Sequence, residues 1–349
     1  MRFASDNSGP AAPEIIEAIG RANQGYAASY GGDSLTARVQ EKIREVFEAP
    51  GAAVHLVATG TAANALALAC LCPPWATVYC HDHSHVQADE CGAPEFYTGG
   101  AKLTPLPGPH GKIAPSALRE ALEGSASLGV HNVQNGPLSL TNTTDLGAVY
   151  SVAEVTELCE MAKTHGVGVH MDGARFANAI VQQGCSPAEM TWKAGVDILC
   201  FGGTKNGLMD VEAVVLFDPG LAWEFELRRK RGGHLLSKHR FLAAQMDAYL
   251  NDGLWLRLAG QANRMAARLA RGLETAPGGR LEHPADANMV FAGLPRASHA
   301  RARGAGAEYH FWPVDQNPEG AGEEVLTARM VCNWATTEAE VDRFLELVS

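Results

Sequence analysis

The stretch GVHMDGAR, residues 168–175, decides the fold. Its apolar start predicts a strand over residues 168–171, and the residues after Gly173 predict a helix. Asp172 therefore stands at the carboxyl end of a strand, the edge at which open parallel sheets bind ligands. A carboxylate there pairs with a ligand or only caps the next helix. Arg175 reaches bound oxygens or pairs with Asp172, and position alone leaves these alternatives open.

A second strand leads into a lysine in VDILCFGGTKNG, residues 196–207. Lys205 follows an apolar strand and a Gly-Gly turn. Burying an ammonium group removes favourable hydration, which is unusual unless chemistry uses the amine, and desolvation favours imine formation. The alternative is an exposed loop lysine. The spacing between Asp172 and Lys205 leaves room for one helix and one strand, so we expect neighbouring strand ends that face one cleft.

An anion-binding turn is indicated by ATGTAAN, residues 58–64. It follows a predicted strand and opens an Ala-rich helix, where backbone N–H groups and the helix dipole favour a phosphate. Gly60 allows close approach of the backbone, and the Thr61 hydroxyl adds a donor. Small residues open many helices, so this signal is weak on its own.

The segment HDHSH, residues 81–85, places His85 after another predicted strand. Its imidazole is a candidate to stack on a flat ligand ring. The alternatives are a metal site formed by His81, His83 and His85, or histidines that lie on the surface.

Strands and helices alternate along most of the chain, which predicts a mostly parallel α/β sheet. The expected strands are residues 54–58, 77–80, 129–133, 137–140, 168–171, 198–201 and 211–217, and the expected helices are residues 13–20, 34–47, 62–71, a helix from Val86, 152–165 and 174–182. After about residue 221 we expect long helices at 222–236 and 241–276, strands at 289–291, 308–311 and 327–331, and a helix at 338–348. This organisation predicts an N-terminal arm and helix (1–25), a large α/β domain (26–245) and a small α+β domain (246–349).

The composition narrows the class of function. The chain has 349 residues, of which 46% are hydrophobic and 19% charged, as in globular proteins with more than one domain. Its formal net charge of −11 argues against nucleic acid or an anionic membrane as a partner. The start MRFASDNSGP lacks the apolar core of a signal peptide, so we predict a cytoplasmic protein. We expect the eight cysteines to be reduced thiols and predict no metal site.

These candidates are the groups that an enzyme using pyridoxal 5′-phosphate (PLP) needs. Such an enzyme needs an amine to hold the cofactor, an acid beside the ring nitrogen, a turn that binds the phosphate, a ring that stacks on the cofactor and a cation that binds the substrate carboxylate. The chain resembles, nearly end to end, the low-specificity L-threonine aldolases of the β-eliminating lyase group. The resemblance is carried by FASDN, SYGGD, ATGTAAN, the His85 region, SLTNT, HMDGAR, GGTKNG and ARMV. The stretch RRKRGGHLLSKHRFLAAQ is most similar to the branch that includes phenylserine aldolases. The resemblance implies the aspartate aminotransferase fold (fold type I), with a large, mostly parallel, seven-stranded sheet domain and a small C-terminal α+β domain.

The resemblance also implies a role for each candidate residue. Lys205 forms a Schiff base with PLP, Asp172 pairs with the ring nitrogen and Arg175 lies near the ring oxygen. The residues implied for the phosphate are Gly60, Thr61 and Ala62. The residues implied for the substrate are Ser5 and Arg329 at the carboxylate, His85 beside the hydroxyl as the candidate base, and Tyr30. An arginine of some members has no match here, and Lys238 or His239 is the substitute. Tyr30 belongs to a loop that implies a homodimer or homotetramer with shared active sites.

The implied reaction is retro-aldol cleavage of a β-hydroxy-α-amino acid, such as L-threonine, L-allo-threonine or L-phenylserine, to glycine and an aldehyde. One departure concerns the base: the family often reads SLENTHN where this chain reads SLTNTTD, so that Thr141 and Thr144 replace a glutamate and a histidine. On the same fold, β-elimination, racemisation and transamination are alternatives, because the fold does not choose the reaction. A catalytically silent homologue that binds a metabolite or a partner protein is the alternative from another class.

Overall fold

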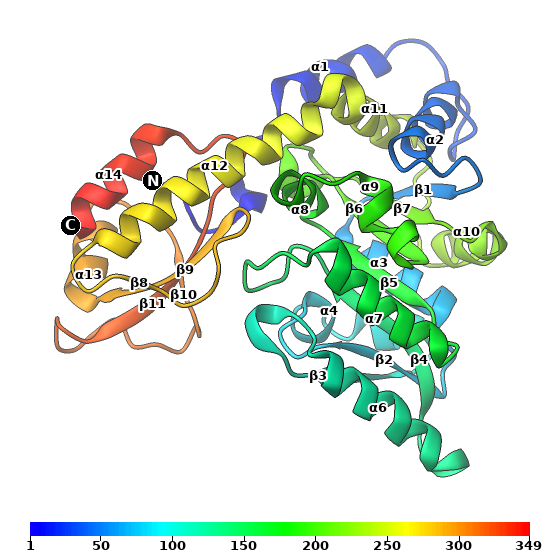
Figure 1. Cartoon of the computed structure of the whole chain (residues 1–349). Helices are drawn as coiled ribbons and strands as arrows, with labels where there is room; N and C mark the ends of the chain where they lie inside the picture. The colour runs from blue at the N-terminus through cyan, green and yellow to red at the C-terminus, as the bar shows by residue number, and fades with distance from the viewer.

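The computed structural model describes the backbone of residues 1–349 and every side chain except that of Ala126. Its large domain is built on a seven-stranded sheet with the order β1-β7-β6-β5-β4-β2-β3 (Figure 1). The strands are β1 (Ala53–Val57), β7 (Glu212–Leu216), β6 (Ile198–Gly202), β5 (Val169–Gly173), β4 (Gln134–Thr141), β2 (Ala76–His81) and β3 (Lys102–Leu106). β7 is antiparallel to both neighbours, and the other neighbours are parallel. The expected large, mostly parallel sheet is confirmed.

Helices cover both faces of this sheet, so β5, β6 and β7 are buried along their whole length. Alternate side chains of β6 pack in opposite directions. Ile198 and Cys200 lie in one cluster with α3 (Gly60–Leu71), whereas Leu199 and Phe201 belong to the larger core that includes α7 (Val152–Thr164). The other helices of this domain are α1 (Pro13–Ala22), α2 (Ser34–Val46), α4 (His85–Ala88), α5 (Ala93–Tyr97), α6 (Pro115–Ser127), α8 (Phe176–Gln183), α9 (Pro187–Met190), α10 (Ala222–Arg231) and α11 (Arg240–Leu250).

Several elements differ from the sequence prediction. The strand expected at 129–133 is a short 3-10 turn at Gly129–His131, where Gly129 has a φ of +56°, and β4 begins after it. The sequence predicts neither α6 nor β3, an edge strand whose Pro105 and mostly part-exposed side chains leave no apolar run. The long helix expected at 241–276 is two helices, α11 and α12 (Leu254–Thr275), because the turn between them takes left-handed φ angles.

The small domain has a four-stranded antiparallel sheet with the order β10-β11-β9-β8. Its strands are β8 (Arg280–Leu281), β9 (Met289–Pro295), β10 (His310–Phe311) and β11 (Val325–Val331), and its helices are α13 (Arg296–Gly304) and α14 (Glu338–Val348). α12 joins the two domains (Figure 1). Its start, through Ala259, packs in the large core, and from Met265 onward it packs in the small one. The small α+β domain is confirmed, and the boundary at residue 246 stays a prediction.

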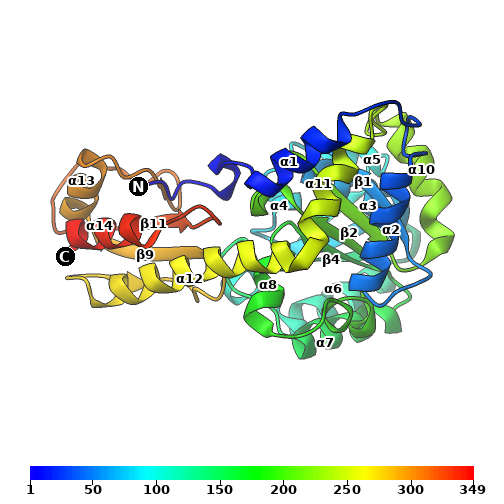
Figure 2. The ribbon, with the colours of Figure 1, turned by 90° about the horizontal axis from the view of Figure 1, so that it is seen from above.

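The N-terminal arm passes between the two domains (Figure 2). Phe3 is buried in the core of the small domain, where the Phe3 N–H donates to the Glu308 carbonyl at 2.8 Å. Farther on, the Ala12 N–H donates to the Gly207 carbonyl of the large domain, also at 2.8 Å. Residues 4–11 are therefore held at both ends, and they cross the boundary between the domains.

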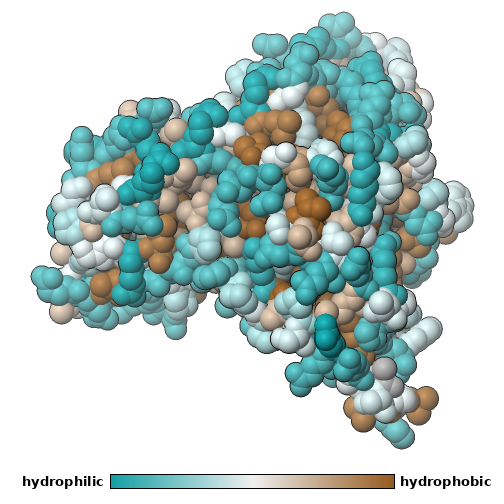
Figure 3. Space-filling view, in the orientation of Figure 1, coloured by the Kyte–Doolittle hydropathy of each residue, from teal (hydrophilic) through white to brown (hydrophobic). Residues whose placement is uncertain are grey.

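The two domains form separate lobes, and most of the face visible in Figure 3 is hydrophilic. Among the described helices, none combines the length and the apolar character that a membrane crossing requires. All eight cysteines are free thiols. No group of three His, Cys, Asp or Glu side chains in the described chain is arranged to hold a metal ion, and the His81 ring instead contacts the Gly108 carbonyl at 3.1 Å.

Candidate active site

The two strand ends singled out in the sequence are neighbours. β5 and β6 pair in parallel with Asp172 opposite Cys200, and the chain after β6 turns at Gly202 and Gly203 into Lys205. A Cβ atom at Gly202 would lie 2.4 Å from the Ala174 carbonyl oxygen, so only glycine permits this close approach of the two chain segments. The positive charge of Lys205 is one of the causes that lower the pKa of Asp172. The acid and the amine therefore interact at one sheet edge, as expected.

Asp172 is a buried carboxylate held by several donors. Its Oδ1 accepts a hydrogen bond from the Ala174 N–H at 2.9 Å, and its Oδ2 accepts one from the Asn64 side-chain amide at 3.0 Å. Burial by itself raises the pKa of Asp172, but Lys205 and the Ala174 N–H outweigh it, so the pKa lies below its ordinary value. Asp172 thus steadies the turn after its strand and also supplies a permanent negative charge to the site.

The stacking candidate His85 is held by a fully buried glutamate. His85 Nδ1 lies 2.8 Å from Glu90 Oε1, and the same oxygen accepts from the Asn64 amide at 2.8 Å. Asn64 therefore bridges Glu90 and Asp172. Hydrogen bonding to Glu90 raises the pKa of His85, although burial opposes the shift. The contact with Glu90 fixes the edge of the His85 ring, and it favours the protonated form of His85.

The start of α3 offers two free backbone donors. The Thr59 hydroxyl accepts the Ala62 N–H at 3.2 Å, and in the described chain the N–H groups of Gly60 and Thr61 have no partner. A Cβ atom at Gly60 would meet nothing within 4 Å, so the space before these donors is open. Gly60 and Thr61 therefore fit an anion, whereas the N–H of Ala62, the third predicted phosphate residue, is already bonded.

Arg175 pairs with the N-terminal arm, and not with Asp172. Its Nε lies 2.7 Å from Asp6 Oδ2 and its Nη2 lies 3.0 Å from Asp6 Oδ1, and both side chains are almost completely buried. Asn288 of the small domain donates to Asp6 Oδ2 at 3.0 Å. Burial opposes ionisation of Asp6, but Arg175 and Lys205 hold its pKa below the ordinary value. This cluster joins the arm to both domains beside the site.

Ser5 and Arg329, the predicted substrate residues, lie near each other. Arg329 Nη1 contacts the Ala4 carbonyl at 3.5 Å, and no carboxylate of the described chain lies within salt-bridge distance of its guanidinium. Burial, together with the charge of Arg175, lowers the pKa of Arg329. A part-buried arginine without an anionic partner, adjacent to Ser5, fits a ligand carboxylate.

Tyr30 and Lys238 lie together, but away from these residues. The Tyr30 N–H donates to the Ser237 carbonyl at 3.0 Å, and Lys230 Nζ lies over the Tyr30 ring at 4.6 Å from its centre. Tyr30 and Lys238 are both exposed. No contact in the described part of the chain joins either of them to Lys205. Their predicted role at a neighbouring subunit's site therefore stays a prediction.

Four polar residues of the site were missed as such in the sequence. They are Asp6, Asn64, Glu90 and Asp145, and Asp145 accepts the His85 backbone N–H at 3.1 Å. Asn64 closes the ATGTAAN turn and Asp6 lies in FASDN, so both lie in motifs that point to the site. Asp145 closes the stretch SLTNTTD, which the family resemblance also covers, whereas Glu90 carries no such local signal.

The donor set as a whole fits PLP. It offers an amine at Lys205, an anion for a protonated ring nitrogen at Asp172 and free N–H groups for a phosphate at Gly60 and Thr61. The His85 ring supplies a stacking face, and Glu90 holds its edge.

Known proteins share this sequence and fold. The family model described as beta-eliminating lyase matches residues 2–295. The chain is 42% identical to the low specificity L-threonine aldolase of Pseudomonas aeruginosa over 99% of this chain and 96% of that protein. It is 40% identical to that of Pseudomonas sp. (strain NCIMB 10558) over 98% and 95%, respectively. The solved threonine aldolase of Leishmania major superimposes with a TM-score of 0.91 at 30% identity, over 99% and 98%. With its sheet order, its site and these relatives, the chain belongs to the β-eliminating lyase family, whose cofactor is PLP and whose fold is fold type I.

Proposed function

We propose that this protein cleaves L-threonine, L-allo-threonine and related β-hydroxy-α-amino acids such as L-phenylserine to glycine and an aldehyde. The observation that carries the proposal is that Asp172 and Lys205 follow neighbouring strands and that the charge of Lys205 lowers the pKa of Asp172. Arg329, which has no carboxylate partner in the described chain, contacts the arm at Ala4, next to Ser5. The names of the two Pseudomonas relatives support the same reaction.

Each residue has a defined task toward the cofactor. PLP supplies an electron-withdrawing ring that stabilises negative charge on the α-carbon of an amino acid. Lys205 is the amine that would hold it, and Asp172 would keep the ring nitrogen protonated because its own pKa is low. Gly60 and Thr61 would bind the phosphate, and His85 would cover one face of the ring.

The substrate is oriented through its carboxylate. Arg329 and Ser5 would hold this group, and their fixed positions decide which bond at the α-carbon stands perpendicular to the ring. Since the ring stabilises charge only from a perpendicular bond, this orientation favours breakage of the Cα–Cβ bond over loss of the α-proton. Arg329 is held by the antiparallel pairing of β11 with β9 and β10, so its position is well defined.

A substrate panel tests the proposal. We expect acetaldehyde from L-threonine and benzaldehyde from L-phenylserine, and no pyruvate or ammonia from L-serine. Borohydride reduction followed by peptide mapping should place the PLP adduct on Lys205. Lys205→Ala should abolish both adduct and activity. Arg329→Ala should retain the adduct and raise KM roughly 10- to 150-fold, because a hydrogen bond to a charged group contributes about 1.5–3 kcal/mol. Pyruvate from serine without any aldehyde release would favour β-elimination and contradict the proposal.

We also propose that the protein is cytoplasmic and a homodimer or homotetramer with shared active sites. The exposed ring of Tyr30 supports this, because its loop is held by the contact with Ser237 and no contact in the described chain joins it to Lys205. Light scattering should give two or four times the mass of the 37.0 kDa chain. Tyr30→Phe should lower activity without changing the spectrum of bound PLP, and a monomeric wild type with full activity would contradict the proposal.

A further inference from the structure

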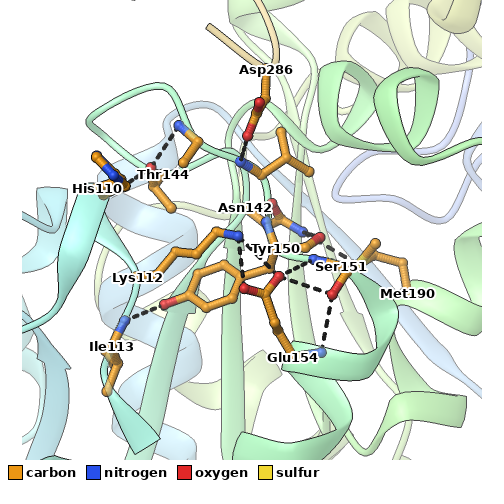
Figure 4. A network of polar contacts seen from close by, with 12 residues as sticks. His110, Lys112, Ile113, Asn142, Thr144, Tyr150, Ser151, Glu154, Met190 and Asp286 are labelled. Carbon is orange, nitrogen blue, oxygen red and sulfur yellow. Dashed lines mark hydrogen bonds and ion pairs between the residues drawn. The ribbon is translucent and has the colours of Figure 1, made fainter. Parts of the chain in front are cut away.

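A rigid loop follows β4 at the edge of the site. Asn142 Nδ2 donates to the Tyr150 carbonyl at 3.3 Å, and the Tyr150 N–H donates back to Asn142 Oδ1 at 3.1 Å (Figure 4). The Tyr150 hydroxyl accepts the Ile113 N–H at 2.6 Å, and Asp286 of the small domain accepts the Val149 N–H at 3.0 Å. Residues 142–150 are thus fixed by both domains, as a catalytic group requires of its support.

Asp145 lies at the end of this loop that faces the site. Its Oδ2 accepts the His85 backbone N–H at 3.1 Å. A continuous path of hydrogen bonds then runs from His85 through Glu90 and Asn64 to Asp172. The charged groups that face Asp145 come from every side of the site: His85 of α4, Asp172 and Arg175 at the end of β5, Lys205 after β6, and Arg329 of β11. Asp145 therefore belongs to the same cluster of charged groups as Asp172 and Lys205.

The two other groups available at this position are poor proton acceptors. Thr144 donates its hydroxyl hydrogen to the His110 carbonyl at 2.8 Å, and its oxygen accepts the Ala148 N–H at 3.1 Å (Figure 4). Both hydrogen bonds of the Thr144 hydroxyl are made to backbone groups of the protein, at His110 and Ala148. His85 is already paired with Glu90 through its Nδ1, and this pairing raises the pKa of His85. The protonated form of His85 is therefore favoured, and a protonated imidazole does not accept a proton. In the described chain, Asp145 has no side-chain cation within salt-bridge distance.

We propose that the Asp145 carboxylate is the base that accepts the β-hydroxyl proton of the substrate, which deepens the proposed aldolase function and rests on it. The proton passes from the hydroxyl oxygen to a carboxylate oxygen of Asp145. The electron pair of the O–H bond becomes the second bond of the aldehyde C=O. The pair of the broken Cα–Cβ bond stays on the α-carbon, which takes up one proton to become the methylene carbon of glycine. Asp145 then returns its proton to water.

The electrostatic environment suits this task. Burial, followed by the negative charge of Asp172, raises the pKa of Asp145. A carboxylate with a raised pKa binds a proton more tightly than a free one, which improves general-base catalysis. The positive charges of Arg175, Lys205 and His85 oppose this rise in the pKa of Asp145.

The test compares three variants of the holoenzyme. Asp145→Asn keeps the size of the side chain and removes the base, and Asp145→Glu keeps the carboxylate. Asp89→Asn is the matched control, because Asp89 is an exposed aspartate near the same site, outside the proposed machinery. We expect Asp145→Asn to lower kcat for aldehyde release about 10²- to 10⁴-fold, Asp145→Glu to recover part of this loss, and Asp89→Asn to resemble the wild type. The acid limb of the kcat–pH profile should disappear in Asp145→Asn.

Two further measurements separate catalysis from structure. The first measurement is the exchange of the α-protons of glycine in D₂O. Glycine has no β-hydroxyl, so this exchange needs Lys205 and the cofactor but not the proposed base. Asp145→Asn should therefore exchange these protons at a rate close to that of the wild type. In ¹⁵N-histidine-labelled holoenzyme, the His85 amide resonance should titrate with the Asp145 carboxyl, and it should not titrate in Asp145→Asn.

The outcomes distinguish the two proposals. If the wild type releases no aldehyde, the proposed function fails, and Asp145 has no β-hydroxyl to act on. If the wild type is active and Asp145→Asn keeps its kcat and its acid limb, the assignment of Asp145 is overturned. Equal loss of aldehyde release and glycine exchange would show a structural role only, which also overturns it.

Discussion

Removing one partner of the buried pair of Asp6 and Arg175 should strongly destabilise the protein at the domain boundary. The two side chains are 1% and 5% exposed and meet through two hydrogen bonds of 2.7 and 3.0 Å. Asp6→Asn keeps the shape of the side chain but leaves the Arg175 guanidinium as an uncompensated buried charge. Removing one partner of such a pair costs about 3–5 kcal/mol, whereas an exposed pair contributes about 0.2–1 kcal/mol.

The assay is urea unfolding of the PLP-free protein, followed by far-ultraviolet circular dichroism. The control is Glu346→Gln, which breaks the exposed pair with Arg343, whose side chains are 65% and 57% exposed. The double variant Asp6→Asn/Arg175→Gln removes the buried charge itself, so it should be more stable than Asp6→Asn alone. Asp6→Asn should also raise KM, because the arm positions Ser5 beside Arg329. A loss of stability no greater than that of Glu346→Gln would refute the reasoning.

Two further predictions concern the strands that carry the site. Gly202→Ala places a Cβ atom 2.4 Å from the Ala174 oxygen, so it should destabilise the protein by about 1–3 kcal/mol and weaken PLP binding, whereas Gly20→Ala, with nothing within 4 Å, should raise stability by about 0.5–1 kcal/mol in thermal melts. Burial lowers the pKa of His170 from 6.5 to about 4, so as the pH falls the unfolded chain takes up a proton at this histidine before the folded chain does. The contribution of neutral His170 to the free energy of unfolding should be fully present above pH 6.5 and should fall by about 3 kcal/mol as the pH drops to 4. His170→Gln should lack that part of the decline in urea unfolding measured across this range, and an unchanged decline would contradict the assignment.

The parts of the site that the sequence predicts are those marked by local signals. Asp172, Lys205 and Gly60 each follow an apolar strand at a glycine-containing turn, and that pattern alone places a residue at the binding edge of a parallel sheet. In the structure Asp172 and Lys205 follow neighbouring strands, and the charge of Lys205 lowers the pKa of Asp172, whereas their roles toward a cofactor stay predictions.

The partners of these residues are set by tertiary contacts, and a local pattern does not reveal them. Arg175 pairs with Asp6, 169 residues away, although Asp172 is its nearest acid in the chain. Asn64 meets Asp172 across 108 residues. Such contacts depend on how the arm and α3 pack on the sheet, and that packing is decided by the whole core. For the same reason the edge strand β3 was missed, because an edge strand buries too little to show an apolar pattern.

The roles of the two site carboxylates follow from the donors around each. Asp172 receives the Ala174 N–H and the Asn64 amide and interacts with Lys205, so its charged form is stabilised and its pKa falls. Asp145 receives only one backbone N–H, and burial, followed by the negative charge of Asp172, raises its pKa. The ionised form of the first carboxylate is therefore, after burial, one cause of the raised pKa of the second. The acid beside the ring nitrogen must not take the ring proton, whereas the base must take the hydroxyl proton, so the two carboxylates need opposite shifts. One site supplies both shifts because its hydrogen-bond donors are distributed unequally between the two groups.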